Sequence, residues 1–253
     1  MTALRTLAFG EDSVWGTAWA SASAGATLAA LGAGPEVIVV SEVGLSDSAA
    51  DPSGEWRLDG DGVALVVSPA GELVEVQAEG KDGIEGWHQL VRVSGRFGRG
   101  AGQHEHEVEC LGLRSSWSDA VDLAKFASIR AVSAWFDPDE AYALTAFRPR
   151  KAKAHDGDAV AAAAITPDGA PAVEDPRLST TYAGDGWPAR AGLELWLASD
   201  PESDQHYPRR ASGKAAGARA QTLAGDFELQ AEPFRWHSRG REGAGMYVLA
   251  RRQ

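Results

Sequence analysis

Cysteine is almost absent from this sequence of 253 residues, which contains only Cys110. A single cysteine excludes an internal disulfide framework. The sequence also lacks a run of roughly 20 apolar residues, the length that a helix needs to cross a bilayer. The first residues, MTALRTLAFGEDS, contain no long apolar core of the kind found in a secretory signal peptide. We therefore expect a protein of the reducing cytoplasm that does not insert into a membrane.

Positive charge is in deficit, because 24 Lys and Arg residues stand against 36 Asp and Glu residues and give a formal net charge of −12. Nucleic acids and anionic membrane surfaces attract basic proteins, so we expect neither as a partner. Phosphate-binding motifs are also missing, since no glycine-rich loop precedes a helix and there is no Walker lysine. A Gly-x-Ser-x-Gly nucleophile elbow is absent as well. We therefore expect no cofactor.

Long helical patterns are the third absence. Short alternating or β-branched segments recur instead, separated by turn signals such as DGDG at 59–62 and PAG at 69–71. This spacing predicts about sixteen to twenty strands, and one helical patch at residues 116–125 with Ser118 as its N-cap. We predict an all-β fold of two consecutive lipocalin-like antiparallel β-barrels or sandwiches with little helix. The N-terminal domain is expected at residues 1–120 and the C-terminal domain at 121–253.

The centre of the chain predicts one long hairpin, formed by residues 87–97 and 104–112 around the glycine-rich link GRGAGQ. The predicted register places Arg96 opposite Glu105, Arg92 opposite Glu109 and Val91 opposite Cys110, the last as a small buried hydrophobe. Such Arg–Glu pairs contribute about 0.2–1 kcal/mol each. His104 and His106 share a face of this hairpin, but Glu109 lies on the other. The pattern therefore favours packed or solvated histidines over a metal site.

The same hairpin carries GWHQLVRVSG at 86–95 and GLRSSW at 112–117. These segments resemble the carotenoid 1,2-hydratase / AttH-like family, as does the closing segment GAGMYVLARR. The resemblance implies two lipocalin-like units around an apolar ligand site, and either water addition to isoprenoid double bonds or, in related proteins, cyclisation of polyenes. Ser115 and Ser116 stand where the family usually carries His or Asp, so no catalytic acid is carried over there. The matching residues are Gly86, His88, Gln89, Arg92, Val93, Gly95, Gly112, Arg114 and Trp117.

The nine tryptophans either fill the core or line a cavity, and the sequence supports both interpretations equally. An aromatic-lined cavity suits a carbocation or a polarised polyene, because the face of an indole attracts positive charge. Asp119 and Asp122 are the nearest acids able to donate a proton, and a cap or turn role accounts for them too. The predicted ligand-binding residues are Trp117, Trp87, Arg114, Trp135 and Trp196, and the catalytic candidates are Asp119 and Asp122.

Together these patterns predict a protein that binds an apolar small molecule, isoprenoid or polyketide-like, in an aromatic-lined β cavity. One hypothesis is a cofactor-free cyclase, isomerase or hydratase that acts mainly by holding a flexible substrate in a reactive shape. The alternative is a non-catalytic lipocalin-like carrier or a structural interaction protein. Quenching of indole fluorescence by apolar ligands separates a protein with a cavity from one without.

Overall fold

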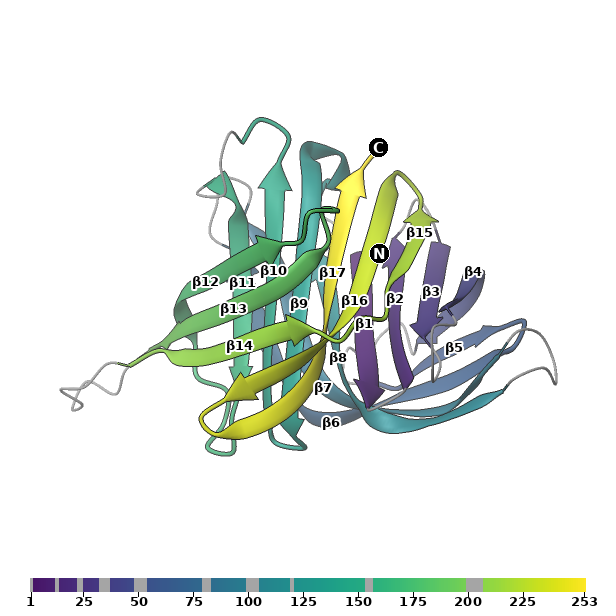
Figure 1. The fold of residues 1–253 in the computed structure, drawn as a ribbon, viewed down its shortest axis with the longest axis horizontal. Helices are drawn as coiled ribbons and strands as arrows, with labels where there is room; N and C mark the ends of the chain where they lie inside the picture. Colours follow the sequence, from purple (N-terminus) through teal and green to yellow (C-terminus); the bar gives the residue numbers. More distant parts are fainter. Residues whose placement is uncertain are drawn as a thin grey trace.

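The computed structural model describes residues 2–11, 14–21, 25–31, 37–47, 54–78, 83–98, 105–118, 121–152, 157–198 and 207–253. Their regular structure consists of strands β1 to β17, in two antiparallel sheets, and one 3-10 turn (Figure 1). The predicted all-β class with little helix is therefore confirmed. Among these residues, no helix is long and apolar enough to cross a membrane.

The first eight strands form a closed barrel in which each strand pairs with the next one along the chain. β1 also pairs with β8, which closes the barrel and leaves no free edge. The barrel is therefore an up-and-down meander. Its strands are β1 (Thr2–Glu11), β2 (Val14–Ser21), β3 (Gly25–Leu31), β4 (Val37–Asp47), β5 (Trp56–Gly60), β6 (Val63–Ala78), β7 (Ile84–Phe97) and β8 (His106–Ser118).

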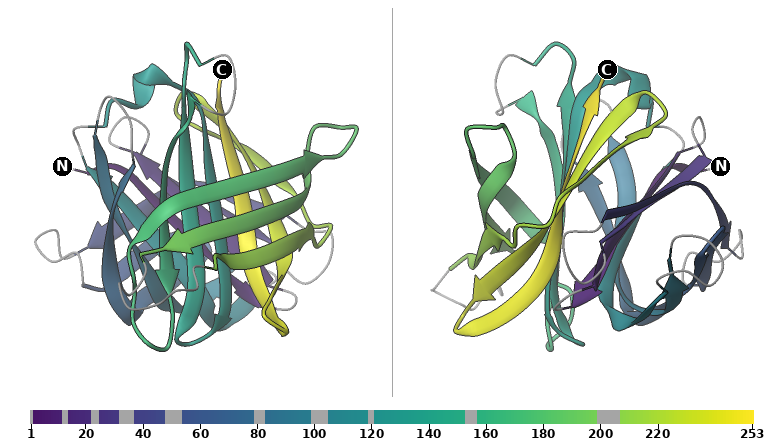
Figure 2. Two further views of the ribbon diagram at one scale, coloured as in Figure 1. Left: turned by 90° about the vertical axis from the view of Figure 1, so that its left-hand side faces the viewer. Right: turned by 45° about the vertical axis from the view of Figure 1, so that its right-hand side comes forward.

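The remaining strands form a second sheet in the order β11-β10-β9-β17-β16-β14-β13-β12, with β15 paired to β16. This sheet curls, so that β12 to β14 cross over β9 to β11 (Figure 2, left). Leu144 of β10 and Leu193 of β13 both belong to the apolar cluster between its two halves. Its strands are β9 (Phe126–Asp137), β10 (Glu140–Pro149), β11 (Ala159–Ile165), β12 (Val173–Tyr182), β13 (Pro188–Leu197), β14 (Arg209–Ala215), β15 (Ala220–Ala224), β16 (Phe227–Ser238) and β17 (Arg241–Arg252).

The barrel packs its outer wall against the second sheet, and the two form facing layers (Figure 2, right). The barrel contributes the large side chains Trp15, Trp19 and Trp117 to this interface. The second sheet contributes many alanines, including Ala143 of β10 and Ala161 of β11. Small side chains on a strand leave room for a large one opposite, because a protein interior has little free volume. In the segment AVAAAAI of β11, Ala159, Ala161 and Ile165 face the barrel, whereas Ala162 and Ala164 pack in the apolar cluster on the other side of the strand.

Two details of the predicted turns and caps are wrong. The PAG segment is not a turn between two strands, because β6 continues through it with a register shift between Pro69 and Leu73. Ser118 is not a helix N-cap but the last residue of β8. The cap is Asp122, whose carboxylate accepts a hydrogen bond from the Ala124 amide and starts the 3-10 turn Leu123–Lys125.

The central hairpin forms, but its register is two residues away from the predicted one. Arg96 lies opposite Glu107, and Val93 lies opposite Cys110. A shift of two residues keeps every side chain on its expected face. The expected ion pairs still form across the diagonal, with Arg92–Glu109 at 3.6 Å and Arg96–Glu105 at 3.7 Å. All four side chains are well exposed, so these contacts contribute little to stability.

The barrel strands end at Ser118 and those of the second sheet begin at Phe126. The division into domains 1–120 and 121–253 stays a prediction about how the two halves behave as separate units.

We predict that Ala161→Leu destabilises the protein by about 1–3 kcal/mol, because the larger side chain overpacks the interface. Ala161 is 2% exposed and belongs to the interface cluster. Urea unfolding followed by indole fluorescence measures the free energy of unfolding. The control is Ala170→Leu at an exposed position, which should stay within about 0.5 kcal/mol of the parent. Equal effects of the two substitutions would contradict the tight interface.

Candidate functional site on the two faces of β7 and β8

Strands β7 and β8 form a wall with a different environment on each face. Side chains alternate along a strand, so Trp87 and Gln89 enter the barrel whereas His88, between them, faces the second sheet. On β8, Arg114 enters the barrel and Ser115 faces the second sheet. The register pairs Gln89 with Arg114, and His88 with Ser115. The barrel mouth and the interface chamber described below therefore lie back to back on one hairpin.

The barrel mouth is a hollow of about 590 Å³ at the end of the barrel where β6 ends, β7 begins and β8 ends. Its volume lies within the range of about 300–1,000 Å³ typical of small-molecule sites. Trp87, which is half-buried, contributes an indole ring to the inner wall. The hollow is lined by Glu75, Val76, Gln77, Glu85, Gly86, Trp87, Ser116, Trp117 and Ser118.

Arg114 holds Trp87 in position from inside the barrel. It is fully buried, and its guanidinium lies 4.8 Å from the ring centre of Trp56 and 5.5 Å from that of Trp87. Its Nε and Nη2 donate to Gln89 Oε1 at 2.9 and 2.6 Å, and its Nη1 donates to the Gly54 carbonyl at 2.7 Å. A planar guanidinium can stack on indoles and use its N–H groups at the same time. Arg114 therefore positions Trp87 rather than contacting a ligand itself.

The interface chamber lies on the opposite face of the same wall, between the barrel and β9, β10 and β17. It has room for about one water molecule, at about 20 Å³. Polar side chains gather there in an otherwise apolar interface, and the small side chains of Ala131 and Ala143 leave the space. The chamber is lined by Thr6, Leu7, Ala8, Thr17, Trp19, His88, Leu113, Ser115, Ala131, Val132, Ser133, Ala143, Thr145 and Val248.

His88 is the most unusual group in this chamber. Its Nδ1 lies 2.6 Å from Ser115 Oγ, and its ring meets Trp117 edge to face at 5.3 Å. Its Nε2 has no hydrogen-bond partner among the described residues, and the same holds for Nε1 of Trp19 and Nε1 of Trp117. Burial away from water lowers the pKa of His88 to about 3, because the charged form loses its hydration. His88 is therefore a neutral ring that can exchange a hydrogen bond with a molecule in the chamber.

The sequence-predicted site residues separate into three places. Trp87 and Arg114 come together at the barrel mouth, and Trp117 lies between the mouth and the interface, 4.9 Å from Phe147. Trp135 lies in the interface cluster and donates its Nε1 to the Gly10 carbonyl at 3.2 Å. Trp196 lies on the far surface of the second sheet, where its Nε1 donates to Glu194.

Of the two acids proposed as proton donors, Asp122 is exposed and occupied as the cap of the 3-10 turn. Asp119 lies outside the described residues. His104 of the central hairpin also lies outside them. Within the described ranges, no three His, Cys, Asp or Glu side chains come close enough to hold a metal ion.

Trp56, Ser115 and His88 were not predicted as site residues. His88 could have been found from the shared motif, because Gly86, His88, Gln89, Arg114 and Trp117 all converge on this wall. Gly86 illustrates the cause, since a side chain there would overlap the indole of Trp117 across the strand pair. Nothing in the sequence around Trp56 relates it to Arg114.

The buried His88 predicts a specific pH dependence of stability. The unfolded chain binds a proton near pH 6.5 and the folded protein only near pH 3, so the unfolded state binds more protons between these values. Stability therefore falls as the pH drops below 6.5. Replacing His88 by Gln should remove about 2 kcal/mol of the loss seen between pH 7.5 and pH 5, as measured by urea unfolding at each pH. His237→Gln, at an exposed site, should change the loss by less than His88→Gln does, and an unchanged loss in the His88→Gln variant would contradict a neutral buried His88.

Comparisons with known proteins agree on the fold. No family model and no curated protein matches this sequence. Among solved structures, CghA matches with a TM-score of 0.66 at 15% identity, over 100% of this chain and 89% of CghA, and CghA with Sch210972 matches with 0.67. A candidate AttH from Nitrosomonas europaea matches with 0.62 at 11% identity, over 98% of this chain and 91% of that one. Kievitone hydratase from Nectria haematococca matches with 0.59 at 10% identity, over 99% and 89%. The chain thus has the two-sheet, lipocalin-like fold of these proteins, and the predicted resemblance to AttH-like proteins is confirmed at the level of the fold.

Proposed function

We propose that this protein binds an apolar small molecule, isoprenoid or polyketide-like, in the barrel mouth. The observation that carries the proposal is a hollow of about 590 Å³ whose wall includes the indole of Trp87, held in place by Arg114. A rigid aromatic wall stabilises a bound apolar chain by excluding water at little cost in side-chain entropy. The carboxylates of Glu75 and Glu85, with Ser116 and Ser118, suit a ligand that carries one polar end.

The structural neighbours support a small molecule as the ligand. One structure of CghA contains Sch210972, and another neighbour is named a kievitone hydratase. Both matches span essentially this whole chain, so they include the barrel that contains the mouth. The proposal rests on the cavity of this chain itself. The small molecules named for the neighbours favour it over a structural role without a ligand.

We propose catalysis without a cofactor as the finer hypothesis. A cavity that holds a flexible polyene in one reactive shape can lower a barrier by about 7–11 kcal/mol at best through positioning alone. Indole faces would stabilise positive charge that develops on the chain during cyclisation or hydration. The competing hypothesis is a carrier that returns its ligand unchanged.

The interface chamber is a second candidate for the reacting part of the site. The Nε2 atom of His88 is the observation that favours it, because a buried imidazole nitrogen without a partner among the described residues is costly and usually marks a place where another polar group binds. The present space admits only a water-sized molecule, so a substrate there requires the barrel and the second sheet to move apart. A single water at His88 would suit hydration of a double bond next to it.

Trp87→Ala should weaken binding of farnesol and of a conjugated polyene fatty acid at least tenfold, about 1.4 kcal/mol, because the aromatic wall is lost. Titration followed by ligand and indole fluorescence gives the dissociation constants. Trp196→Ala is the matched control, since it removes an indole from the far surface of the second sheet. Binding that is unchanged by Trp87→Ala but weakened by Trp196→Ala would move the ligand out of the barrel mouth.

Incubation with linear polyenes, followed by separation and mass measurement, divides the two functional hypotheses. An enzyme should yield a product of equal mass and altered retention, or a product heavier by one water. Trp87→Ala should then lower the rate at least tenfold if the reaction takes place in the barrel mouth, and His88→Gln should do so if it takes place in the interface chamber, whereas Trp196→Ala should not in either case. Quantitative recovery of every bound ligand in unchanged form would identify a carrier instead.

A further inference from the structure

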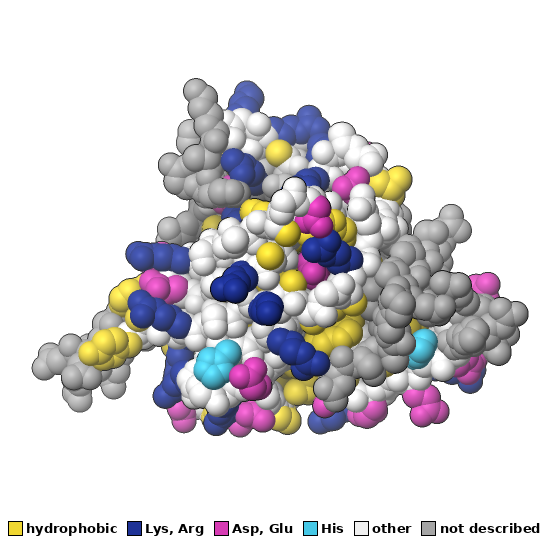
Figure 3. All heavy atoms as spheres, in the orientation of Figure 1, with side chains coloured by type: hydrophobic (Ala, Val, Ile, Leu, Met, Phe, Trp, Pro, Cys, Tyr) yellow, Lys and Arg dark blue, Asp and Glu magenta, His cyan; other side chains and the backbone are white. Residues whose placement is uncertain are grey.

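A second surface of the molecule carries an arrangement of charge that the small-molecule site does not use. It is the outer face of β12, β13, β14 and β16, on the side of the second sheet away from its apolar cluster. Figure 3 shows Lys and Arg side chains spread over this face, which Figure 1 places at the front left. We name it the basic groove, defined by Arg177, Ser179, Arg190, Gly192, Glu194, Arg210, Ser212, Lys214, Arg235 and His237.

One side of the basic groove is a row of three cations. Arg190 of β13 lies directly opposite Lys214 of β14, which lies directly opposite Arg235 of β16. All three side chains are exposed, and none forms an ion pair with any described residue. Like charges directly opposite each other destabilise a sheet. A row of this kind therefore costs stability in the free protein and gains from an anionic partner.

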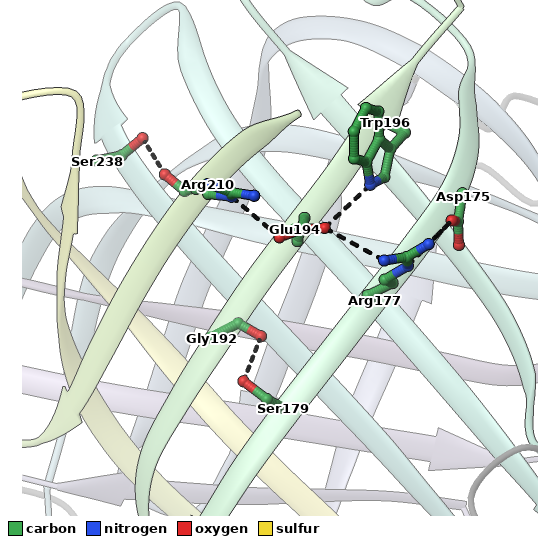
Figure 4. Close-up of polar contacts among 8 residues, drawn as sticks. All are labelled: Asp175, Arg177, Ser179, Gly192, Glu194, Trp196, Arg210 and Ser238. Atoms are coloured by element: carbon green, nitrogen blue, oxygen red, sulfur yellow. Dashed lines mark hydrogen bonds and ion pairs between the residues drawn. The ribbon is translucent and has the colours of Figure 1, made fainter. Parts of the chain in front are cut away.

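The other side of the groove is a row in which charges alternate. Arg177, Glu194 and Arg210 lie opposite one another on β12, β13 and β14. Figure 4 shows the Glu194 carboxylate between the two guanidinium groups, at 3.5 Å from Arg177 and 2.9 Å from Arg210. Arg177 is also held by Asp175 at 2.6 Å. This row is therefore ordered by its own ion pairs, in contrast to the first.

The floor of the groove, between the two rows, contains no Lys, Arg, Asp or Glu side chain. Ser179, Gly192, Ser212 and His237 form it, and a hollow of about 570 Å³ on one side and one of about 630 Å³ on the other share these four residues. Ser179 Oγ donates to the Gly192 carbonyl at 3.4 Å (Figure 4), and a side chain at position 192 would collide with that hydroxyl. The groove is therefore a continuous depression with hydroxyl groups at its base.

This face carries mainly positive charge, in contrast to the chain as a whole. Arg177, Arg190, Arg210, Lys214, Arg235 and Arg239 surround the two hollows, whereas the acids there are Asp175, Glu194 and Glu242. The whole chain carries −12. A local positive field on an acidic protein attracts a compact acidic surface, and the remaining negative charge repels a long polyanion such as nucleic acid.

We propose that the basic groove is the docking site for an acidic segment of a partner protein. Neighbouring strands lie about 4.8 Å apart, so the row Arg190–Lys214–Arg235 spans about 10 Å. Residues three or four apart on a helix have Cβ atoms about 5–6 Å apart, which is close to the spacing of neighbouring strands. Arginine forms paired hydrogen bonds with carboxylates, and the Ser212 hydroxyl of the floor adds a further donor. The proposal does not depend on the function of the barrel mouth.

The test uses a fluorescein-labelled peptide of eight glutamates as the probe, with fluorescence anisotropy at low and physiological salt. The groove variant combines Arg190→Ser, Lys214→Ser and Arg235→Ser. The control variant combines Arg150→Ser, Lys151→Ser and Arg251→Ser, three exposed cations outside the groove. Both variants carry the same net charge, so a difference between them reports the groove and not the overall charge. Thermal unfolding of both variants verifies that they fold.

We expect the groove variant to bind the peptide at least tenfold more weakly than the parent protein, and the control variant to stay within twofold. Binding by the parent should also weaken as salt is raised, because exposed charges are screened. Absence of binding by the parent at low salt, or equal losses in both variants, would overturn the proposal. Stronger competition by a DNA duplex of equal charge than by unlabelled peptide would overturn it in favour of nucleic acid.

Discussion

Alternation of side chains along β7 and β8 is the constraint on which the rest of the structure depends. At residues 88–91 of β7 and 112–117 of β8, each side chain lies either inside the barrel or against the second sheet, and both places are buried. Arg114 and Ser115 are neighbours in the chain, yet one is clamped between indoles and the other holds a histidine in an apolar interface. Two independent environments therefore restrict one short segment, and few substitutions satisfy both.

The fold class could be predicted from the sequence because strand period and turn residues are local signals. The hairpin register could not, because a shift of two residues leaves every side chain on the same face and keeps Arg92 and Arg96 within reach of glutamates. The missing information is a close approach: Gly86 lies opposite Trp117, and only a residue without a side chain fits there. Such contacts join distant segments and have no local pattern.

The site was predicted in part for the same reason. Trp87, Arg114 and Trp117 lie in or beside a recognisable motif, and the structure brings them to one wall. Trp196 was predicted from residue type alone, and it lies on the opposite surface with Glu194. The pairing of Trp56 with Arg114 depends on barrel closure, and the isolation of His88 depends on the contact between barrel and second sheet. The basic groove likewise arises only when β13, β14 and β16 align, since its cations are far apart in the chain.

The position of β17 has a consequence for how the chain acquires its structure. The barrel is complete once residue 118 has been made, because all its strands precede that point. β9 is made next, but one of its two neighbours is the final strand, with Trp135 paired to Ala244. On the ribosome, β9 and the alanine-rich strands β10 and β11 beside it cannot complete their sheet until the last residues of the chain have been made. Contacts between residues so far apart in the sequence form slowly. The finished barrel, with its exposed indoles, is then the surface on which the late half assembles.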